Sequence, residues 1–207
     1  MPSSSSDLPP ATPPTAQMHD ALDAWGAEVG GDAVTPLAAV RIDANERIVI
    51  PFTTQVQSTK VHYLKTTELT GYVQCLGNGC MLCQAGKKPE DRGLLPVYDV
   101  EEQAVGILCV APNLRQNALR ALLMPILRRL HQGERLVVTI SHSGHGRYTV
   151  NAQLLADSID DGAGRIQQFL RNFENGGVDL AAVFPRLTNE ELASIPGIAS
   201  ILKVKGN

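Results

Sequence analysis

Four residues that can bind a metal ion lie within one short stretch of the chain. His62 is followed by Cys75, Cys80 and Cys83 in the pattern H-x12-C-x4-C-x2-C, so that three of the four cysteines in 207 residues fall within nine positions. Three thiolates and one imidazole complete the tetrahedral shell of a zinc ion, and four protein ligands leave no position for a catalytic water. The pattern therefore predicts one structural Zn2+ ion.

Two parts of this prediction have alternatives. Cys80 and Cys83 could instead form a redox pair, but no predicted helix begins at these residues to lower a thiol pKa, which favours metal binding. The fourth ligand also remains open, because His142 or His145 could replace the histidine upstream of the cysteines.

The candidate ligands lie on or beside short predicted strands that glycine-bearing turns separate. Strands are expected near 46–52, 61–64, 71–75, 94–100, 105–110, 136–141 and 147–155. Leucines at three- and four-residue spacing predict a long helix over 113–130, with Asn113 as its N-cap. Thr188 and Glu191 form a capping-box pattern that predicts a helix in the tail. Many short strands of this kind favour a mainly β fold with helices (α+β), an OB-fold-like small barrel with an inserted zinc-binding subdomain.

Charge and composition divide the chain into three parts. Residues 1–40 carry five acidic residues and no Lys or Arg, and their Ser/Pro-rich start predicts a disordered acidic arm. Residues 41–156 carry thirteen basic and nine acidic residues and form the predicted zinc-stabilised core. Residues 157–207 form a predicted helical C-terminal segment. The mild positive charge of the core is compatible with a polyanionic partner.

Several functional classes are disfavoured by the sequence. No run of 18 apolar residues and no secretory signal is present, and clustered thiols are typical of a reducing compartment, so we expect a cytoplasmic protein without a membrane partner. The sequence has no phosphate-binding glycine loop, no nucleophile elbow and no paired-carboxylate motif. We therefore expect that the chain is not an enzyme.

The order of these elements resembles the single-stranded DNA-binding (helix-destabilising) proteins of the T-even bacteriophages. The resemblance covers roughly residues 46–155 and is carried by RIVIPF, the twelve residues between His62 and Cys75, the knuckle CMLC, LLPVYDVE, VGILCV, the long helix and the hairpin LVVTISHSGHGRYTV. It implies an OB-fold core, a zinc site made by His62, Cys75, Cys80 and Cys83, and binding of single-stranded DNA with little sequence preference.

The chain departs from that family in its N-terminal segment, which is acidic and proline-rich where the phage proteins have a basic segment for cooperative binding. The loop between Cys75 and Cys80 is also shorter, and the chain ends in KVKGN without an acidic tail. The implied role is DNA replication, recombination or repair, with replication or recombination proteins as further partners. Because of these departures, the resemblance does not extend to cooperative binding or to recruitment through a tail, and the sequence leaves both open.

Binding of single strands combines a basic groove with aromatic side chains on which bases stack. The candidate contact residues are Lys60, Tyr63, Lys65, Tyr72, Lys87, Lys88, Arg92, Arg147 and Tyr148. Each has an ordinary alternative, because the tyrosines can be core residues and the basic side chains plain surface. The alternative function is a zinc-stabilised protein–protein interaction module without strong nucleic-acid binding, which would dock through the acidic arm and the helix around Phe169. A third arrangement has the arm at 1–40 folding over the basic groove and competing with DNA.

Overall fold

The computed structural model describes residues 37–157 and 159–202. Residues 1–36 of the predicted acidic arm at 1–40 lie outside the described residues. The predicted competition of this arm with DNA therefore stays a prediction. Residues from Leu37 onward belong to the same unit as the sheet. The backbones of Ala38 and Val40 exchange hydrogen bonds of 2.9 Å with Ile107, so this short stretch lies along the edge of a strand.

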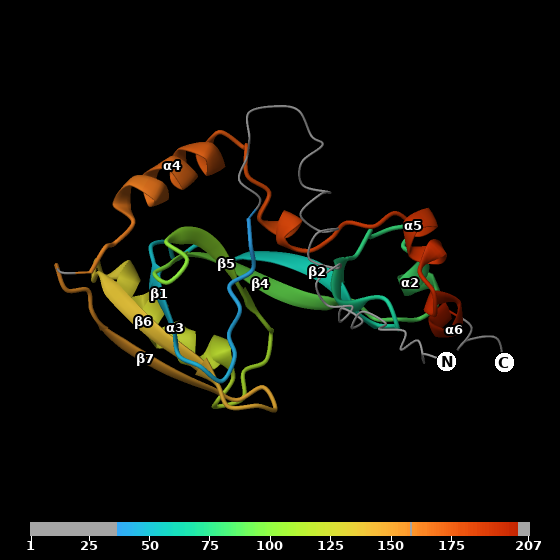
Figure 1. The fold of residues 1–207 in the computed structure, drawn as a ribbon, viewed down its shortest axis with the longest axis horizontal. Helices are drawn as coiled ribbons and strands as arrows, with labels where there is room; N and C mark the ends of the chain where they lie inside the picture. The colour runs from blue at the N-terminus through green and yellow to red at the C-terminus, as the bar shows by residue number, and fades with distance from the viewer. Residues whose placement is uncertain (1–36, 158, 203–207) are drawn as a thin grey trace, which may run out of the picture. The chain divides into compact units, whose positions relative to one another are not determined.

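Seven strands of the described chain form one antiparallel sheet, in agreement with the number predicted (Figure 1). They are β1 (Arg47–Pro51), β2 (Gln57–Lys65), β3 (Thr70–Gln74), β4 (Glu90–Asp99), β5 (Ala104–Val110), β6 (Leu136–His142) and β7 (Tyr148–Leu154). The order is β3-β2-β4-β1-β6-β7, and β5 pairs with β4. The mixed α and β class is confirmed. The sheet is open, because no described pairing joins β5 to β7, so the expected small barrel is not closed.

β4 organises the sheet because it pairs with three other strands. Leu94 pairs with both β2 and β5, and Val97 pairs with both β1 and β5. β1 and β2 therefore lie on the same edge of β4, opposite β5. The register passes from Pro51 opposite Val97 to Gln57 opposite Leu94, so residues 52–56 loop out between them. β1 and β2 act as one long strand with an interruption, and the far end of β2 extends with β3 as a two-stranded ribbon.

The two faces of the sheet are covered by different helices. Helix α3 (Leu119–His131) packs on one face, where alternation of side chains along β4 places Leu95 and Val97. We call this the central core; its buried residues are Val49, Leu95, Val97, Leu108, Val110, Leu119, Leu123, Ile126, Leu136, Val138 and Ile140. On the other face Val61, Leu94 and Ile107 pack against Phe169 of α4 (Ala163–Glu174), Leu180 of the 3-10 helix η1 (Leu180–Val183) and Phe184; this is the C-terminal core.

Helix α3 begins six residues later than the leucine pattern predicts. Asn113 is not its N-cap: the Asn113 side chain instead accepts a hydrogen bond from the backbone of Arg115, which makes a turn. The chain then passes Asn117, whose carbonyl bonds to Tyr148 at the start of β7. The helix continues through Pro125 and ends before Gly133, whose φ of +90° suits glycine at this position.

Three further short helices complete the described chain. Helix α2 (Met81–Gln84) lies within the cysteine loop, and α5 (Asn189–Ser194) and α6 (Ile198–Leu202) lie near it. The capping box predicted for the tail is confirmed, because the Thr188 side chain accepts from the Glu191 backbone and the Glu191 carboxylate accepts from the Thr188 backbone. No helix within the described ranges combines the length and the apolar character needed to cross a membrane.

Candidate metal centre

The β2–β3 ribbon positions two of the four predicted ligands. His62 pairs with Val73 across the ribbon, and Cys75 follows Val73 by two residues. Because side chains two positions apart in a strand share a face, this register directs the imidazole and the Cys75 thiol to the same side. The backbone amide of Cys75 bonds to the carbonyl of Lys60 at 2.8 Å, which continues the ribbon pairing past the end of β3.

A tight loop positions the other two ligands. Gly77 and Gly79 have φ values of +70° and +92°, a conformation that glycine adopts without strain. The amide of Cys80 bonds back to the Gly77 carbonyl at 3.1 Å, which closes the turn. Cys80 then begins the single turn of α2, and Cys83 lies within that helix. The C-x2-C spacing thus places both sulfurs on the same side of one helical turn.

The four ligand atoms meet at one point. The Nε2 atom of His62 lies 3.5 Å from the sulfur of Cys80 and 3.4 Å from that of Cys83, and the sulfurs of Cys75 and Cys83 are 3.5 Å apart. All four atoms lie within 4.8 Å of one another. Around a tetrahedral zinc with ordinary bond lengths, sulfur and nitrogen ligands are separated by about 3.5 Å and two sulfurs by about 3.8 Å. The geometry is therefore that of a metal-binding site and is compatible with a single zinc ion.

The chemical state of the ligands also suits a metal. His62 is 2% exposed, and burial lowers its pKa, which favours the neutral imidazole that can coordinate a metal. Burial raises the pKa of the Cys80 thiol, but hydrogen bonds from backbone amides, with that of Cys83 the strongest, lower it by more. Burial raises the pKa of Cys83, and its hydrogen bond with Cys75 and repulsion between thiolates that share the site raise it further. A bound cation removes that repulsion.

The outer surroundings of the site differ from the usual arrangement at one atom. A metal-bound histidine normally donates its second ring N–H to a carboxylate or a carbonyl. The Nδ1 atom of His62 is buried and has no such partner among the described residues. The orientation of the ring is therefore set by packing in the ribbon and by the cysteines.

The C-terminal segment fastens the cysteine loop, a role that sequence reasoning missed. The side chain of Asn189, at the start of α5, accepts from the amide of Met81 at 3.0 Å and donates to the carbonyl of Gly79 at 2.9 Å. Leu192 and Ile198 are fully buried against the loop. The knuckle core consists of Leu64, Val73, Cys80, Leu82, Leu192 and Ile198. The capping box marks where α5 begins, but no sequence signal indicates that this helix docks on residues 110 positions upstream.

The alternative histidines lie elsewhere. His142 ends β6 and its ring is 4.7 Å from that of Tyr148, whereas His145 occupies the β6–β7 turn with a φ of +50°. Neither belongs to the cluster of possible metal ligands. The structure therefore assigns the fourth position to His62.

Three of the predicted contact residues come together on one face of the ribbon. Tyr63 and Tyr72 are direct cross-strand partners with ring centroids 5.1 Å apart. The guanidinium of Arg92 lies 4.3 Å from the centroid of the Tyr72 ring and donates to the Tyr72 hydroxyl. Burial raises the pKa of Tyr72, so this hydroxyl stays protonated. Tyr63 is 50% exposed, whereas Tyr72 also packs against Phe184. We call Tyr63, Tyr72 and Arg92 the tyrosine platform.

The other predicted contact residues are separate from this platform. Lys60 lies on the opposite face of β2, because it is three residues from Tyr63, and it forms a 3.0 Å ion pair with Asp91. Arg147 and Tyr148 belong to the β6–β7 hairpin. The remaining lysines are exposed; they are Lys65, at the end of β2, and Lys87 and Lys88, which follow α2.

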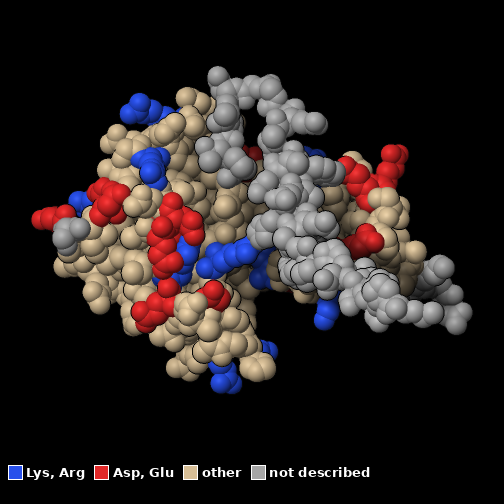
Figure 2. Space-filling view, viewed as in Figure 1, with Lys and Arg blue, Asp and Glu red and all other residues tan. Residues whose placement is uncertain are grey.

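Charge on the visible surface is mixed. Figure 2 shows basic residues interspersed with acidic ones, without a continuous basic track on the part of this face that the structure describes. Two predicted contacts are ion-paired, since Arg92 lies 2.7 Å from Glu90 in addition to the pair made by Lys60.

Comparisons of the chain with protein-family models, with curated proteins and with solved structures found no match.

Proposed function

We propose that the chain is a zinc-stabilised OB-fold protein that binds single-stranded DNA without strong sequence preference and acts in DNA replication, recombination or repair. The observation that carries the proposal is the tyrosine platform, in which the half-exposed ring of Tyr63 packs on Tyr72 and Tyr72 on Arg92, beside the candidate metal ligands. The family resemblance to the T-even phage proteins is part of the same proposal. No catalytic role is proposed for any residue.

The strand connectivity supports an OB fold. Such a fold is a partly open barrel of five strands, with a helix between the third and fourth strands. If the interrupted strand β1–β2 is counted as the first, then β4, β5, α3, β6 and β7 follow in that order. β1 pairs with both β4 and β6, as the first strand of the barrel does. The ribbon and the metal cluster are then an insertion between the first two barrel strands.

The positions of the contact residues agree with this assignment. OB folds bind oligonucleotides with the loop between strands 1 and 2 and the loop between strands 4 and 5. In this chain the first of these is the metal-binding insertion, which carries Tyr63, Tyr72 and Lys65. The second is the β6–β7 hairpin, which carries Arg147 and Tyr148. The candidate contacts on the ribbon and those on the hairpin are far apart in the sequence. In an OB fold they would lie on the two loops that contact one strand of DNA.

Zinc has a structural role in this proposal. Three thiolates and one imidazole close the shell, so the ion would hold the ribbon and the cysteine loop in place and thereby fix the tyrosine platform. The shell gives no open coordination position for a substrate.

The test is a fluorescence titration with oligo-dT at several salt concentrations. Affinity should fall steeply with salt, because contacts to phosphates release counterions. Tyr63→Leu should weaken binding by roughly 5- to 150-fold, the equivalent of about 1–3 kcal/mol for one stacked base. Tyr63→Phe keeps the ring and serves as the matched control, with near wild-type affinity. No binding at low salt, or equal effects of the two variants, would reject the proposal.

One observation favours the alternative function. Lys60 and Arg92 are already ion-paired, and the described part of the face in Figure 2 shows no basic track. A protein-docking module needs no such track. A zinc-stabilised interaction module would bind oligo-dT weakly, with the same affinity for Tyr63→Leu and wild type. The titration above therefore separates the two functions.

A further inference from the structure

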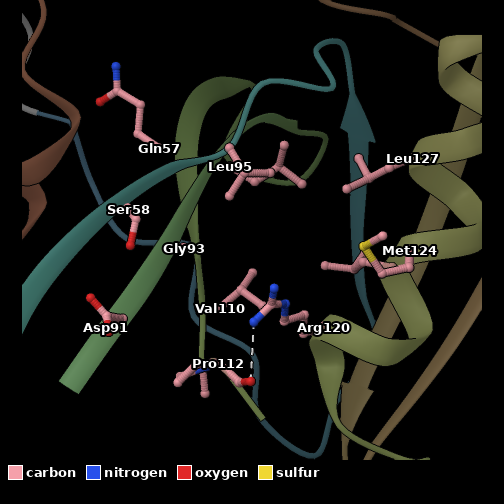
Figure 3. A pocket seen from close by; sticks show the side chains of 13 residues that line it. Gln57, Ser58, Asp91, Gly93, Leu95, Val110, Pro112, Arg120, Met124 and Leu127 are labelled. Atoms are coloured by element: carbon pink, nitrogen blue, oxygen red, sulfur yellow. Dashed lines mark hydrogen bonds between the residues drawn. The ribbon is translucent and has the colours of Figure 1, made fainter. Parts of the chain in front are cut away.

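A groove lies between the strands and α3, on the face of β4 opposite to the tyrosine platform (Figure 3). Its volume is about 280 Å³, near the small end of the range of ligand pockets. The buried residues Leu95, Val110 and Leu123 line its depth. Val56 and Met124 stand at its mouth and are 47% and 42% exposed. The groove thus has space for one ring system with apolar faces.

The floor of the groove is flattened by a glycine. A Cβ atom at Gly93 would lie 3.1 Å from a Val56 methyl group and 3.7 Å from the Cβ of Val110, both of which line the groove. Any side chain at this position would therefore fill part of the space. Figure 3 shows Gly93 on the strand side and Met124 and Leu127 on the helix side, so the two walls face each other across a narrow gap.

The rim carries polar groups of both kinds. Asp91 and Ser58 lie on the strand side (Figure 3). One carboxylate oxygen of Asp91 accepts from Lys60, and the described residues provide no donor to the other. On the helix side, Arg120 donates to the carbonyl of Pro112 at 3.3 Å, which holds its guanidinium at the edge of the groove. The rim therefore offers an acceptor, a hydroxyl and a cation around an apolar bed.

From this combination we propose that the groove binds one unstacked nucleobase of a single strand, with an exocyclic amino group of the base donating to Asp91 and the adjacent phosphate near Arg120. An apolar side chain of a protein would make no use of the second carboxylate oxygen of Asp91 or of the remaining N–H groups of Arg120. A base has flat apolar faces and a polar edge, and carboxylates accept from the amino group of cytosine. Thymine has no amino donor, so the groove favours cytosine over thymine.

This inference rests on the proposed function and deepens it. Lys60 and Asp91 are paired across β2 and β4, as are Thr59 and Arg92, so the groove and the tyrosine platform lie on opposite faces of these strands. They therefore contact different nucleotides of one strand. The bias for cytosine is a modest preference within otherwise sequence-tolerant binding.

The first experiment blocks the groove in the full, zinc-loaded chain. Met124→Trp places a large ring at the mouth of the groove, at a position that is already exposed, so the fold should be kept. We expect at least fivefold weaker binding of oligo-dC. Leu154→Trp is the matched control, because Leu154 is 66% exposed on β7, outside the groove, and its affinity should not change. Equal affinities of the two variants would overturn the proposal.

The second experiment measures base preference with oligo-dC and oligo-dT of equal length. The wild type should bind oligo-dC about fivefold more tightly, and Asp91→Asn should reduce the ratio of the two affinities to below about twofold. Glu68→Gln removes an exposed acid elsewhere, so it controls for the general gain in affinity when a negative charge is lost and should leave the ratio unchanged. A wild-type ratio of one, or the same ratio in Asp91→Asn, contradicts the assignment of Asp91.

The failure of this inference differs from failure of the proposed function. If both oligonucleotides bind with equal affinity and Met124→Trp binds normally, the groove proposal is wrong and the proposed function stands. If neither binds at low salt, the proposed function is wrong, and a titration with deoxycytidine monophosphate followed by NMR decides the groove. Shift changes confined to Ser58, Gly93 and Leu127 would support a base site, and no changes at millimolar nucleotide would overturn it.

Discussion

The central core and the knuckle core are held together by different physical means. The central core has eleven buried residues, all of them apolar, from four strands and a helix of 13 residues. The knuckle core has six buried residues, one of which is the metal-ligand candidate Cys80, and its helices have four, six and five residues. Helices this short are marginal in water without tertiary support. Burial of apolar surface can maintain the first region, whereas we expect the second to depend on a metal bound by His62 and the three cysteines.

Loss of the metal should produce the largest difference in stability between the two regions. Zinc ligation in zinc-finger peptides is worth about 10–16 kcal/mol of apparent free energy, so a bound ion would be a large part of what holds the knuckle core together. Cys83→Ser, or chelation, should therefore unfold the ribbon from about 61 to 86 together with α5 and α6, and leave β4 to β7 folded. Hydrogen exchange monitored by mass spectrometry would show loss of protection in the first segments only.

The control for that experiment is Cys109→Ser. Cys109 lies outside the cluster, and burial raises its pKa to about 11, so it is an inert thiol. This variant should keep one zinc per chain and the protection of the ribbon. If chelation removed protection equally from both regions, or from neither, the contrast between them would not hold.

A cavity in the central core should lower the stability of the whole fold and leave metal binding intact. Leu108 is 1% exposed and packs beneath α3. Leu108→Ala should reduce the global free energy of unfolding by about 2–5 kcal/mol, because it removes buried methyl groups and leaves a cavity. Denaturant titration would measure this loss, and the folded variant should still bind one zinc. Loss of zinc before global unfolding would mean that the ribbon depends on the central core more closely than its contacts indicate.

The smallest effect is expected where the C-terminal segment touches the cysteine loop. Asn189→Ala removes two hydrogen bonds to the loop backbone, at 3.0 and 2.9 Å, and should cost about 1–3 kcal/mol locally. Zinc should dissociate several-fold faster to a competing chelator, with little change in the global unfolding transition. Asn175→Ala, at the exposed end of α4, is the matched control and should release zinc at the wild-type rate.

Local patterns in the sequence predict the parts of this molecule that local forces form. The capping box at Thr188 and the spacing from His62 to Cys75 involve residues that are close along the chain or on adjacent strands, and both predictions agree with the structure. The start of α3 was predicted wrongly, because Asn113 can cap a turn as well as a helix. The side chain alone does not distinguish these two uses.

Long-range pairing explains most of what sequence reasoning could not supply. The first four residues of β2 are polar, and they are strand only because β4 pairs with them. Phe184 packs on Tyr72 and Asn189 on the cysteine loop across more than 100 residues of sequence. The separation of Lys60 from Tyr63 follows from strand alternation, and a stricter use of that rule would have placed them on opposite faces.

The fastening of Gly79 by Asn189 has a consequence for synthesis of the chain on the ribosome. The cysteines of the loop are translated more than 100 residues before the asparagine that holds them. At a translation rate of about 5–20 residues per second, the thiols are synthesised on the order of 5–20 s before Asn189 and helix α5. During that interval they would be open to oxidation and to capture of other thiophilic metals, so we expect the ion that the loop takes up to depend on the metal supply around the ribosome.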